Sequence, residues 1–245
     1  MKKSIIVIFL QGGKGGVGKT EVALALIAWV RSKGYSPLLL DFDIENTNKS
    51  GLQNFHPEAR KLDVHAEGSL DEFFDACDEE GIEIVIADLG AGAGKATYQW
   101  FENAAQDAAE LGISFTSVGV ATNDAGAVQS VLKWASHLQD SVKYLTVLNE
   151  FREPNSKFDY WHSEPATARF IKAFSPHIIV MPSRLQEFQA ELRNHSLTLQ
   201  QVIDGKTKVP FFKKTRCLVN ARRYQRDLFA GFEAASEILL PPSDS

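Results

Sequence analysis

The chain is poor in the residues that cross-link a protein or anchor it in a membrane. Its 245 residues include only two cysteines, Cys77 and Cys217, which lie far apart and form no C-x-x-C pair. Six histidines are scattered without the spacing of metal ligands. No run of about 20 apolar residues is present, so we expect no transmembrane segment. These absences exclude a disulfide framework and a common zinc centre, and they predict a reduced, cytoplasmic protein.

The overall composition is that of an ordinary globular protein, with 44% hydrophobic and 23% charged residues. A chain of this length can bury most of its apolar surface in one α/β domain without disulfides or metals. We therefore expect residues 1–245 to form a single domain.

One glycine-rich segment carries the clearest chemical signal. Residues 13–20 read G-K-G-G-V-G-K-T, which fits the phosphate-binding pattern G-x-x-x-x-G-K-[S/T]. The apolar run 4–10 predicts a buried strand before it, and the pattern at 21–31 predicts a helix that starts at Lys19. Glycines let backbone N–H groups point at a phosphate, and the positive end of the helix adds to the attraction. Lys19 is expected to reach the β and γ phosphates, and Thr20 to bind Mg²⁺.

Strand and helix patterns alternate along the chain. We predict further strands at 37–41, 62–65, 82–88, 114–122, 144–148 and 178–181, and helices at 70–79, 96–110 and 125–137. This alternation predicts an α/β fold with a mostly parallel, twisted sheet flanked by helices on both faces. Together with the phosphate-binding loop, it leads us to expect a single P-loop NTPase domain. Ligands of such sheets bind beyond the carboxyl ends of the strands. The segments that follow strands there, and should share one site, are 13–20, 41–48, 88–94, Asn149 and Pro182.

Two carboxylates end apolar strands. Asp88 is expected to hold Mg²⁺ through water, and Asp41 to lie close to the metal. The alternative for Asp88 is a helix cap or a turn.

Together these segments resemble the ParA/MinD family of ATPases, which have a deviant Walker A motif. The distinguishing residue is Lys14, which makes the loop K-G-G-V-G-K-T. Residues 38–44 are similar to the second strand and switch I of that family, with Asn48 where it often carries an asparagine, and residues 82–92 look like its Walker B strand and switch II. Residues 147–149 and 180–182 match its base-flanking segments. The resemblance spans 4–182 in the order of the family.

The resemblance implies a Mg²⁺-dependent ATPase that forms a homodimer with ATP. Lys14 would reach the nucleotide of the partner, Asp43 would orient the attacking water, and Asn149 would hydrogen-bond the adenine edge. The alternatives, a solvated loop carboxylate at 43 and a strand-end asparagine at 149, stay open. The implied catalytic residues are Lys14, Lys19 and Asp43, and the implied metal site is Thr20, Asp41 and Asp88. The implied nucleotide site is Gly13, Lys14, Gly15, Gly16, Val17, Gly18, Lys19, Thr20, Glu21, Asn149 and Pro182.

The chain departs from the partition proteins of the family after its second strand. Where these often read D-x-D-P-Q-G, residues 41–46 read D-F-D-I-E-N, which resembles the MinD side more. Two functions therefore compete with DNA partition or transfer. One is a MinD-like ATPase that positions itself on a membrane surface, and the other is a metabolic enzyme similar to dethiobiotin synthetase. Lys14 argues against the metabolic enzyme, and the lack of a bridging cysteine pair argues against iron–sulfur relatives.

A basic segment near the C-terminus is the second informative feature. Residues 206–226 hold eight lysines and arginines and no acid, although the whole chain has 26 basic and 31 acidic residues. Apolar residues recur at helical spacing from Leu218 to Leu239, which predicts an amphipathic helix at about 215–240 with its basic side in solvent. The competing interpretations are a solvated face, a surface for the DNA backbone and a surface for anionic membranes. The candidate DNA contacts are Lys213, Lys214, Arg216, Arg222, Arg223 and Arg226.

Two features concern partners. The basic tail resembles that of the ParA-like ATPases of conjugative plasmid transfer, of the TraL type, which implies non-specific DNA and an unidentified protein partner or cargo. Residues 151–165, with Phe158, Tyr160 and Trp161, predict either a partner-binding loop or a loop whose aromatic side chains fold back on the domain.

Overall fold

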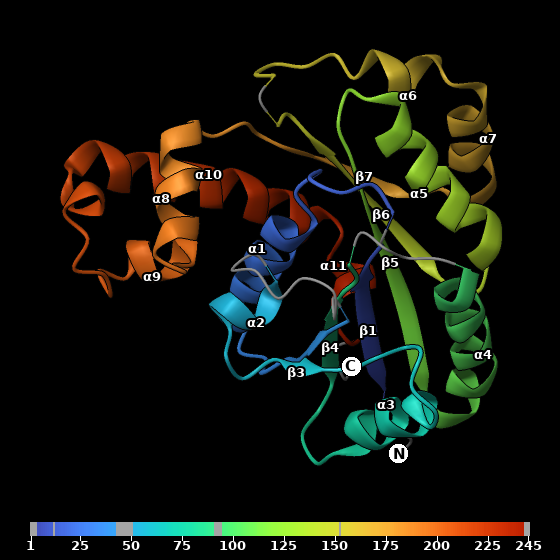
Figure 1. The fold of residues 1–245 in the computed structure, drawn as a ribbon. Coiled ribbons are helices and arrows are strands. Elements are labelled where there is room, and N and C mark those ends of the chain that lie inside the picture. The colour runs from blue at the N-terminus through green and yellow to red at the C-terminus, as the bar shows by residue number, and fades with distance from the viewer. Residues whose placement is uncertain (1–3, 12, 43–50, 91–94, 152, 243–245) are drawn as a thin grey trace.

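The protein is described by a computed structural model that covers residues 4–11, 13–42, 51–90, 95–151 and 153–242. These residues form a seven-stranded sheet in the order β3-β2-β4-β1-β5-β6-β7, in which all neighbouring strands run parallel (Figure 1). The parallel α/β fold expected from the sequence is thus confirmed. The strands are β1 (Ile5–Leu10), β2 (Leu38–Asp41), β3 (Arg60–Lys61), β4 (Ile84–Asp88), β5 (Ile113–Ala121), β6 (Lys143–Asn149) and β7 (His177–Met181).

Helices cover both faces of this sheet, as the alternation of patterns predicts (Figure 1). The helices of the first two thirds are α1 (Lys19–Ser32), α2 (Leu52–Phe55), α3 (Ser69–Asp78), α4 (Lys95–Leu111), α5 (Ala125–Leu138), α6 (Asp159–Ser163) and α7 (Pro165–Phe174). The helices of the last third are α8 (Gln186–Asn194), α9 (Leu199–Ile203), the 3-10 helix η1 (Pro210–Lys213), α10 (Thr215–Ala234) and α11 (Ser236–Leu239).

The two faces of β1 support two separate apolar cores. Successive side chains of a strand point to opposite faces, so Val7 and Phe9 join one core and Ile6, Ile8 and Leu10 the other. The first core packs against α3, α4, α5 and α7, with Phe9 between rings of α4 and α5. The second packs against α1, α10 and α11. Because β1 is buried along its whole length, the loop that follows it starts from a rigid support.

The last third of the chain forms a helical arm, which we define as α8, α9, η1 and the first half of α10. It projects to one side of the sheet (Figure 1) and has its own apolar cluster, which includes Phe188, Leu192, Phe212 and Ala221. The second half of α10 belongs instead to the second apolar core, in which Phe232 is fully buried. A Cβ at Gly231 would lie 3.2 Å from the Cβ of Ile179, so glycine allows α10 to approach β7 closely there.

Two predicted elements differ from the structure. The prediction of a strand at 62–65 is wrong, because β3 covers only Arg60–Lys61. The Leu62 N–H still donates to the Asp41 carbonyl, but the Asp63 carboxylate then accepts the His65 N–H at 2.8 Å and turns the chain away. The single helix expected at 215–240 is divided near Ala235 into α10 and α11.

The aromatic segment 151–165 packs mainly on the domain. Phe158 and Trp161 are buried in the first core, and Trp161 lies against Phe170 of α7. Only Tyr160 is half exposed among the three aromatic side chains named from the sequence. The interpretation that the aromatic residues fold back therefore holds for Phe158 and Trp161.

The prediction of one domain can be tested through the core of the arm. Phe212 is 1% exposed and contacts the rings of Phe188 and Phe211. Phe212→Ala should lower the free energy of unfolding by about 3–5 kcal/mol, because it leaves a cavity. In a single domain, urea unfolding followed by circular dichroism and by tryptophan fluorescence should shift as one transition.

The control is Val219→Ala on the exposed side of α10, which should change stability by no more than about 0.5 kcal/mol. A separate early transition in the Phe212→Ala protein would show that the arm unfolds independently and would contradict the single domain.

Candidate nucleotide site

The loop between β1 and α1 has the backbone that phosphate binding needs. Gly13, Gly16 and Gly18 have φ angles of 118°, 75° and 99°, a region that side chains disfavour. A Cβ at Gly13 would lie 2.1 Å from the Ser130 Oγ, and a Cβ at Gly18 would lie 2.6 Å from the Asn149 Nδ2. Both glycines are therefore required by conformation and by close approach. The predicted glycine pattern corresponds to a loop that is closely packed at Gly13 and Gly18.

The first residues of α1 place the predicted phosphate ligands at the end of this loop. Lys19 is buried, and its Nζ donates to the Lys14 carbonyl across the loop at 2.9 Å. Val17 is buried in the second core and so fixes the middle of the loop. Gly18 precedes α1 and has no side chain to cap it, an arrangement that suits the binding of an anion at the first N–H groups of the helix.

Asn149 and Pro182 end two neighbouring strands beside the loop. Asn149 is 4% exposed, and its Nδ2 donates to the Val17 carbonyl at 2.7 Å. Pro182 directly follows β7, whose last residue, Met181, pairs with Asn149. Asn149 thus holds the phosphate loop directly, a role that no sequence pattern predicts. Its predicted contact with adenine remains a prediction.

Lys14 lies on the outside of the loop. Its side chain is 48% exposed, and its Nζ is 3.5 Å from a carboxylate oxygen of Asp124. The Lys14 backbone N–H donates to the Ser130 Oγ at 3.3 Å. Asp124 caps α5 through the Ala127 N–H. The two lysines of the motif therefore have different surroundings, one buried in the loop and one half exposed.

The two strand-end carboxylates lie side by side. Asp41 and Asp88 are partners in the β2–β4 register and are both buried, on the same face as α1. One oxygen of Asp41 is 3.0 Å from the Lys61 Nζ and accepts the Gln53 N–H at 3.0 Å. Asp41 thus holds β3 and α2 in place, whatever its part in metal binding. Asp43 and Asn48 lie outside the described residues, as does the end of the predicted switch II segment from 91 to 94.

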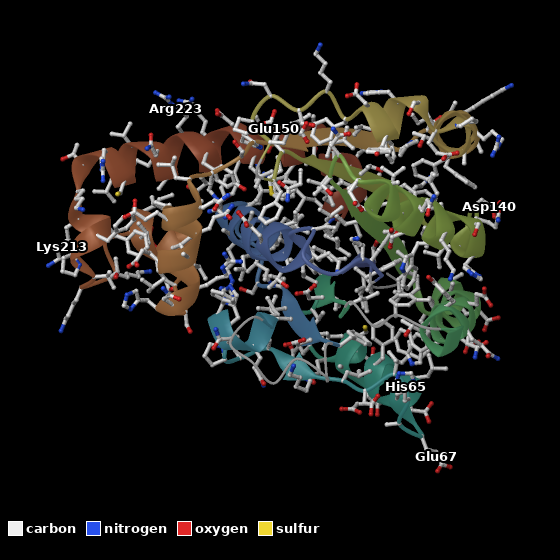
Figure 2. The ribbon with its side chains drawn as sticks, turned by 45° about the horizontal axis from the view of Figure 1, so that its top comes forward. His65, Glu67, Asp140, Glu150, Lys213 and Arg223 are labelled. Atoms are coloured by element: carbon white, nitrogen blue, oxygen red, sulfur yellow. The ribbon has the colours of Figure 1, made fainter. Side chains whose placement is uncertain are left out.

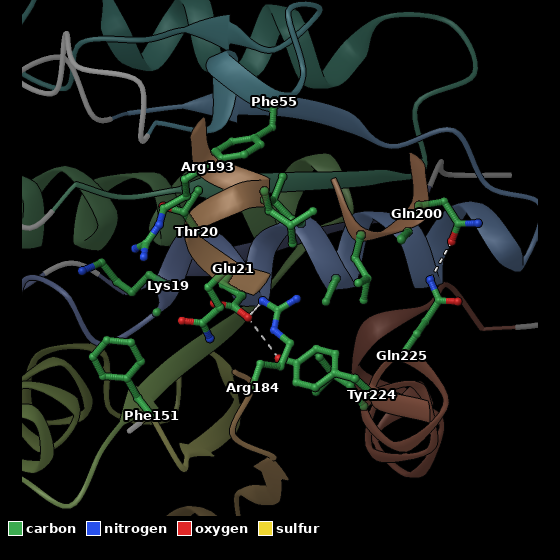
Figure 3. Close-up of a pocket in the computed structure, with 18 of the residues that line it drawn as sticks. Lys19, Thr20, Glu21, Phe55, Phe151, Arg184, Arg193, Gln200, Tyr224 and Gln225 are labelled. Carbon is green, nitrogen blue, oxygen red and sulfur yellow. Dashed lines mark hydrogen bonds and ion pairs between the residues drawn. The ribbon is translucent and has the colours of Figure 1, made fainter. Parts of the chain in front are cut away.

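A cavity of about 300 Å³ opens at the loop and continues between α1 and the helical arm (Figure 3). Gly15, Gly16, Lys19 and Thr20 line one end, and Phe151 of the β6–α6 segment lies beside them. The other end is mostly apolar, with Leu24, Ala25, Ala28, Leu192, Leu228 and Phe229.

Three side chains connect this site to the arm (Figure 3). Arg184 forms an ion pair with Glu21, next to Thr20, and its guanidinium stacks on Tyr224 of α10 at 4.2 Å from the ring centre. The Tyr224 hydroxyl donates to Glu21 at 3.2 Å. Burial lowers the pKa of Arg184 and raises that of Tyr224. The Glu21 carboxylate gives the buried guanidinium a partner of opposite charge.

Sequence reasoning identified Glu21 only as part of the loop and missed Arg184 and Tyr224. Arg184 could have been found, since it follows Pro182 closely at the carboxyl edge of the sheet. Tyr224 lies far away in the sequence on a helix recognised only for its charge, so no local pattern indicated this contact.

The basic face of the arm is separate from the cavity. The residues named from the sequence are all exposed, and Lys213 and Arg223 point outward from the arm in Figure 2. Arg222, Arg223 and Arg226 share the side of α10 opposite the buried Ala221, Tyr224 and Leu228. Arg226 is 3.2 Å from Asp227, which partly offsets its charge. The amphipathic character predicted for this helix is confirmed.

The donor groups at the loop fit a nucleoside triphosphate with Mg²⁺. The loop has a glycine backbone, a buried lysine and the open end of a helix, which suit an anion, and Thr20 and Asp88 carry oxygen atoms of the kind that Mg²⁺ prefers. A parallel sheet with such a loop after its central strand defines a P-loop nucleotide-binding protein.

Comparison with known families also identifies a nucleotide-binding protein, and it assigns the chain to one family within this class. Residues 8–176, well over half of the chain, match the CobQ/CobB/MinD/ParA nucleotide binding domain. The chain belongs to this family, which confirms the likeness to ParA and MinD proteins that the sequence indicated.

Individual relatives are distant. Protein MobD of Acidithiobacillus ferrooxidans is 24% identical over 164 residues, which cover 66% of this chain and 70% of that protein. The MinD cell division protein of Aquifex aeolicus has a TM-score of 0.56 and 14% identity, over 96% of this chain and 98% of its own. MinD in the MinC:MinD complex of the same organism gives a TM-score of 0.55 and 14% identity over 97% and 98%. At this identity the structures establish the fold. Within the described parts of the chain, no helix has the length and apolar character needed to cross a bilayer.

Asn149 allows a test of how the loop is held. Asn149→Ala removes the bond to the Val17 carbonyl, which is buried, and should lower the free energy of unfolding by about 1–3 kcal/mol. If Asn149 also contacts the adenine edge, the variant should lose more affinity for ATP than for GTP in calorimetric titrations.

The control is Asn103→Ala on the exposed side of α4, which should change neither quantity measurably. Equal losses of ATP and GTP affinity in Asn149→Ala would restrict Asn149 to holding the loop and would contradict its role in base recognition.

Proposed function

We propose that the protein is an ATP-binding and slowly hydrolysing switch that dimerises with ATP, in the cytoplasm, in DNA or plasmid partition or transfer. The observation that carries this proposal is the different placement of the two loop lysines. Lys19 is buried and donates within the loop, whereas Lys14 is half exposed on its outer side. A lysine with this exposure is accessible to a second molecule, which supports a role for Lys14 at the nucleotide of a partner subunit.

The ion pair of Lys14 with Asp124 is consistent with this role. Both side chains are about half exposed, at 48% and 50%, and such pairs contribute only about 0–1 kcal/mol. A nucleotide phosphate carries more charge and accepts stronger hydrogen bonds than a solvated carboxylate. Lys14 can therefore exchange Asp124 for a phosphate at little cost when two subunits meet.

The remaining roles follow from the positions of the side chains. Lys19 would neutralise charge on the phosphates, and Thr20 and Asp88 would hold Mg²⁺, directly and through water. Bound Mg²⁺ would offset the negative charge that builds up on the phosphates. Positioning and positive charge supply most of the catalysis of phosphoryl transfer, so a glycine loop with a buried lysine is well suited to slow ATP hydrolysis. Asp43 is proposed as the residue that orients the attacking water.

The basic face of the arm supports association with DNA. Exposed arginines and lysines extend from η1 along the outer side of α10, without competing acids until Asp227. A phosphate backbone fits such a row through charge and without sequence preference. An unidentified protein partner or cargo completes the proposed switch.

The packing of α10 and α11 argues against the membrane alternative. An amphipathic helix binds a membrane through its apolar face. Here Leu228, Phe232 and Leu239 are all fully buried in the second apolar core, so the apolar face of the helix is already covered by the protein itself.

The alternative of a metabolic enzyme differs in one testable property. Such an enzyme would hydrolyse ATP only in the presence of a small-molecule acceptor.

The two lysines should separate binding from dimerisation. Lys19→Ala should abolish detectable ATP binding in calorimetry, because the buried charge at the phosphates is lost. Lys14→Ala should bind ATP with near-normal affinity yet stay monomeric in light scattering and fail to hydrolyse ATP, because its contacts form only between subunits.

Lys133→Ala on α5 is the matched control for the loss of an exposed lysine, and it should dimerise and hydrolyse ATP normally. Unchanged ATP affinity in Lys19→Ala would refute the site. Normal dimerisation and turnover in Lys14→Ala would refute the switch while leaving nucleotide binding intact.

The basic face gives a further prediction. Replacing Arg222, Arg223 and Arg226 with Glu should abolish DNA retention by the ATP-bound protein and leave ATP turnover near normal, because these residues lie outside the cavity. In filter binding across salt, each lost phosphate contact should lower the log–log slope by about 0.9.

A parallel pull-down with anionic liposomes distinguishes the membrane alternative, which predicts retention on liposomes and none on duplex DNA. If the ATP-bound wild type is retained neither on duplex DNA nor on liposomes, the basic face does not bind DNA, and the proposed association with DNA is refuted.

A further inference from the structure

Besides Arg184, a second arginine lines the cavity at the phosphate loop, and this one belongs to the helical arm. Arg193, near the end of α8, lines the same cavity as Gly16, Lys19 and Thr20. In Figure 3 its side chain extends toward the end of the cavity where Lys19 and Thr20 lie. A residue more than 170 positions along the chain thus reaches the predicted phosphate site from the opposite side of the cavity.

The two arginines of the cavity, Arg184 and Arg193, differ in whether a carboxylate neutralises their charge. Arg184 is paired with the Glu21 carboxylate and stacked on Tyr224. Within the described residues, Arg193 forms no ion pair with a carboxylate, and its charge acts on Arg184, whose pKa it helps to lower. Among the described residues that line the cavity, two guanidinium groups and a buried lysine face one carboxylate, so these side chains carry a net positive charge. An anion bound there would relieve this repulsion.

The backbone that carries Arg193 is held in place on both sides. Its neighbour Leu192 is buried in the core of the arm. Just beyond α8, the Ser196 hydroxyl accepts a hydrogen bond from the Asn54 side chain of α2 at 2.9 Å. Gln225 of α10 donates to Gln200 of α9 at 2.6 Å and links the remaining helices of the arm. Arg193 is therefore presented to the cavity by a packed support.

We propose that Arg193 binds the phosphates of the bound nucleotide in the same subunit, so that nucleotide holds the helical arm against the phosphate loop. The guanidinium supplies several N–H donors in one plane, which suits phosphate oxygens. This inference rests on the proposed nucleotide site and adds to it a ligand outside the loop. It also gives the arm, which carries the basic face, a direct contact with the nucleotide.

The test compares nucleotide affinity and nucleotide-induced stability in the full chain. Arg193→Ala should weaken ADP and ATP binding about ten- to hundredfold in calorimetry, the effect of one lost charge-assisted hydrogen bond. Arg193→Lys should recover part of the loss, because it keeps the charge without the planar donors. The unfolding temperature without nucleotide should stay as in the wild type, since Arg193 is exposed, while the increase caused by ATP should shrink.

The matched control is Arg169→Ala, which removes an exposed arginine from α7 and should leave every value unchanged. Wild-type affinity for ATP and ADP in Arg193→Ala would overturn the inference. Lys19→Ala distinguishes a failure of the proposed nucleotide site from a failure of the role of Arg193. If Lys19→Ala loses ATP binding while Arg193→Ala does not, the nucleotide site stands and only the role of Arg193 is wrong. If Lys19→Ala also binds normally, the site itself is wrong.

Discussion

The parallel pairing of β1 with β4 on one side and β5 on the other is the constraint on which the rest of the structure depends. This register places Leu10 beside both Asp88 and Val118, so the loop after β1 leaves the sheet at the level where β4 ends, while β5 continues to Ala121. Both faces of β1 are covered by helices and buried. The loop with its positive-φ glycines, its buried lysine and the uncapped helical N–H groups is therefore supported by a strand that is paired on both edges and buried on both faces.

The central fold and the loop could be predicted because their signals are local. Apolar runs such as Ile5–Leu10 are continuous, since parallel strands are buried on both faces. The glycine spacing, Lys19 and Thr20 lie within eight residues, and Asp88 ends a strand that is apolar throughout. The family membership follows from the same short segments, with Lys14 as the residue that separates this loop from a common phosphate loop.

The helical arm and its contacts could not be predicted in the same way. Its helices α8 and α9 are short, and a turn of helix with one or two buried residues gives no clear period. One local signal exists in the arm, the capping box of Thr198 and Gln201 at the start of α9. Contacts such as Arg184 with Tyr224 join residues that meet only after the sheet has formed, so spacing in the sequence says nothing of them.

The close approach of α10 to β7 at Gly231 has a mechanical consequence. From Gly231 to Arg216 the helix extends about 20 Å, at 1.5 Å per residue, and Tyr224 lies near the middle of this length, against the start of α1. A tilt of about 5° around Gly231 would carry Arg216 through roughly 2 Å, the scale on which a hydrogen bond to a phosphate forms or breaks. Because Tyr224 is seven residues from Gly231 and Arg216 is fifteen, such a tilt would move the basic end of the helix about twice as far as the contact beside the phosphate loop.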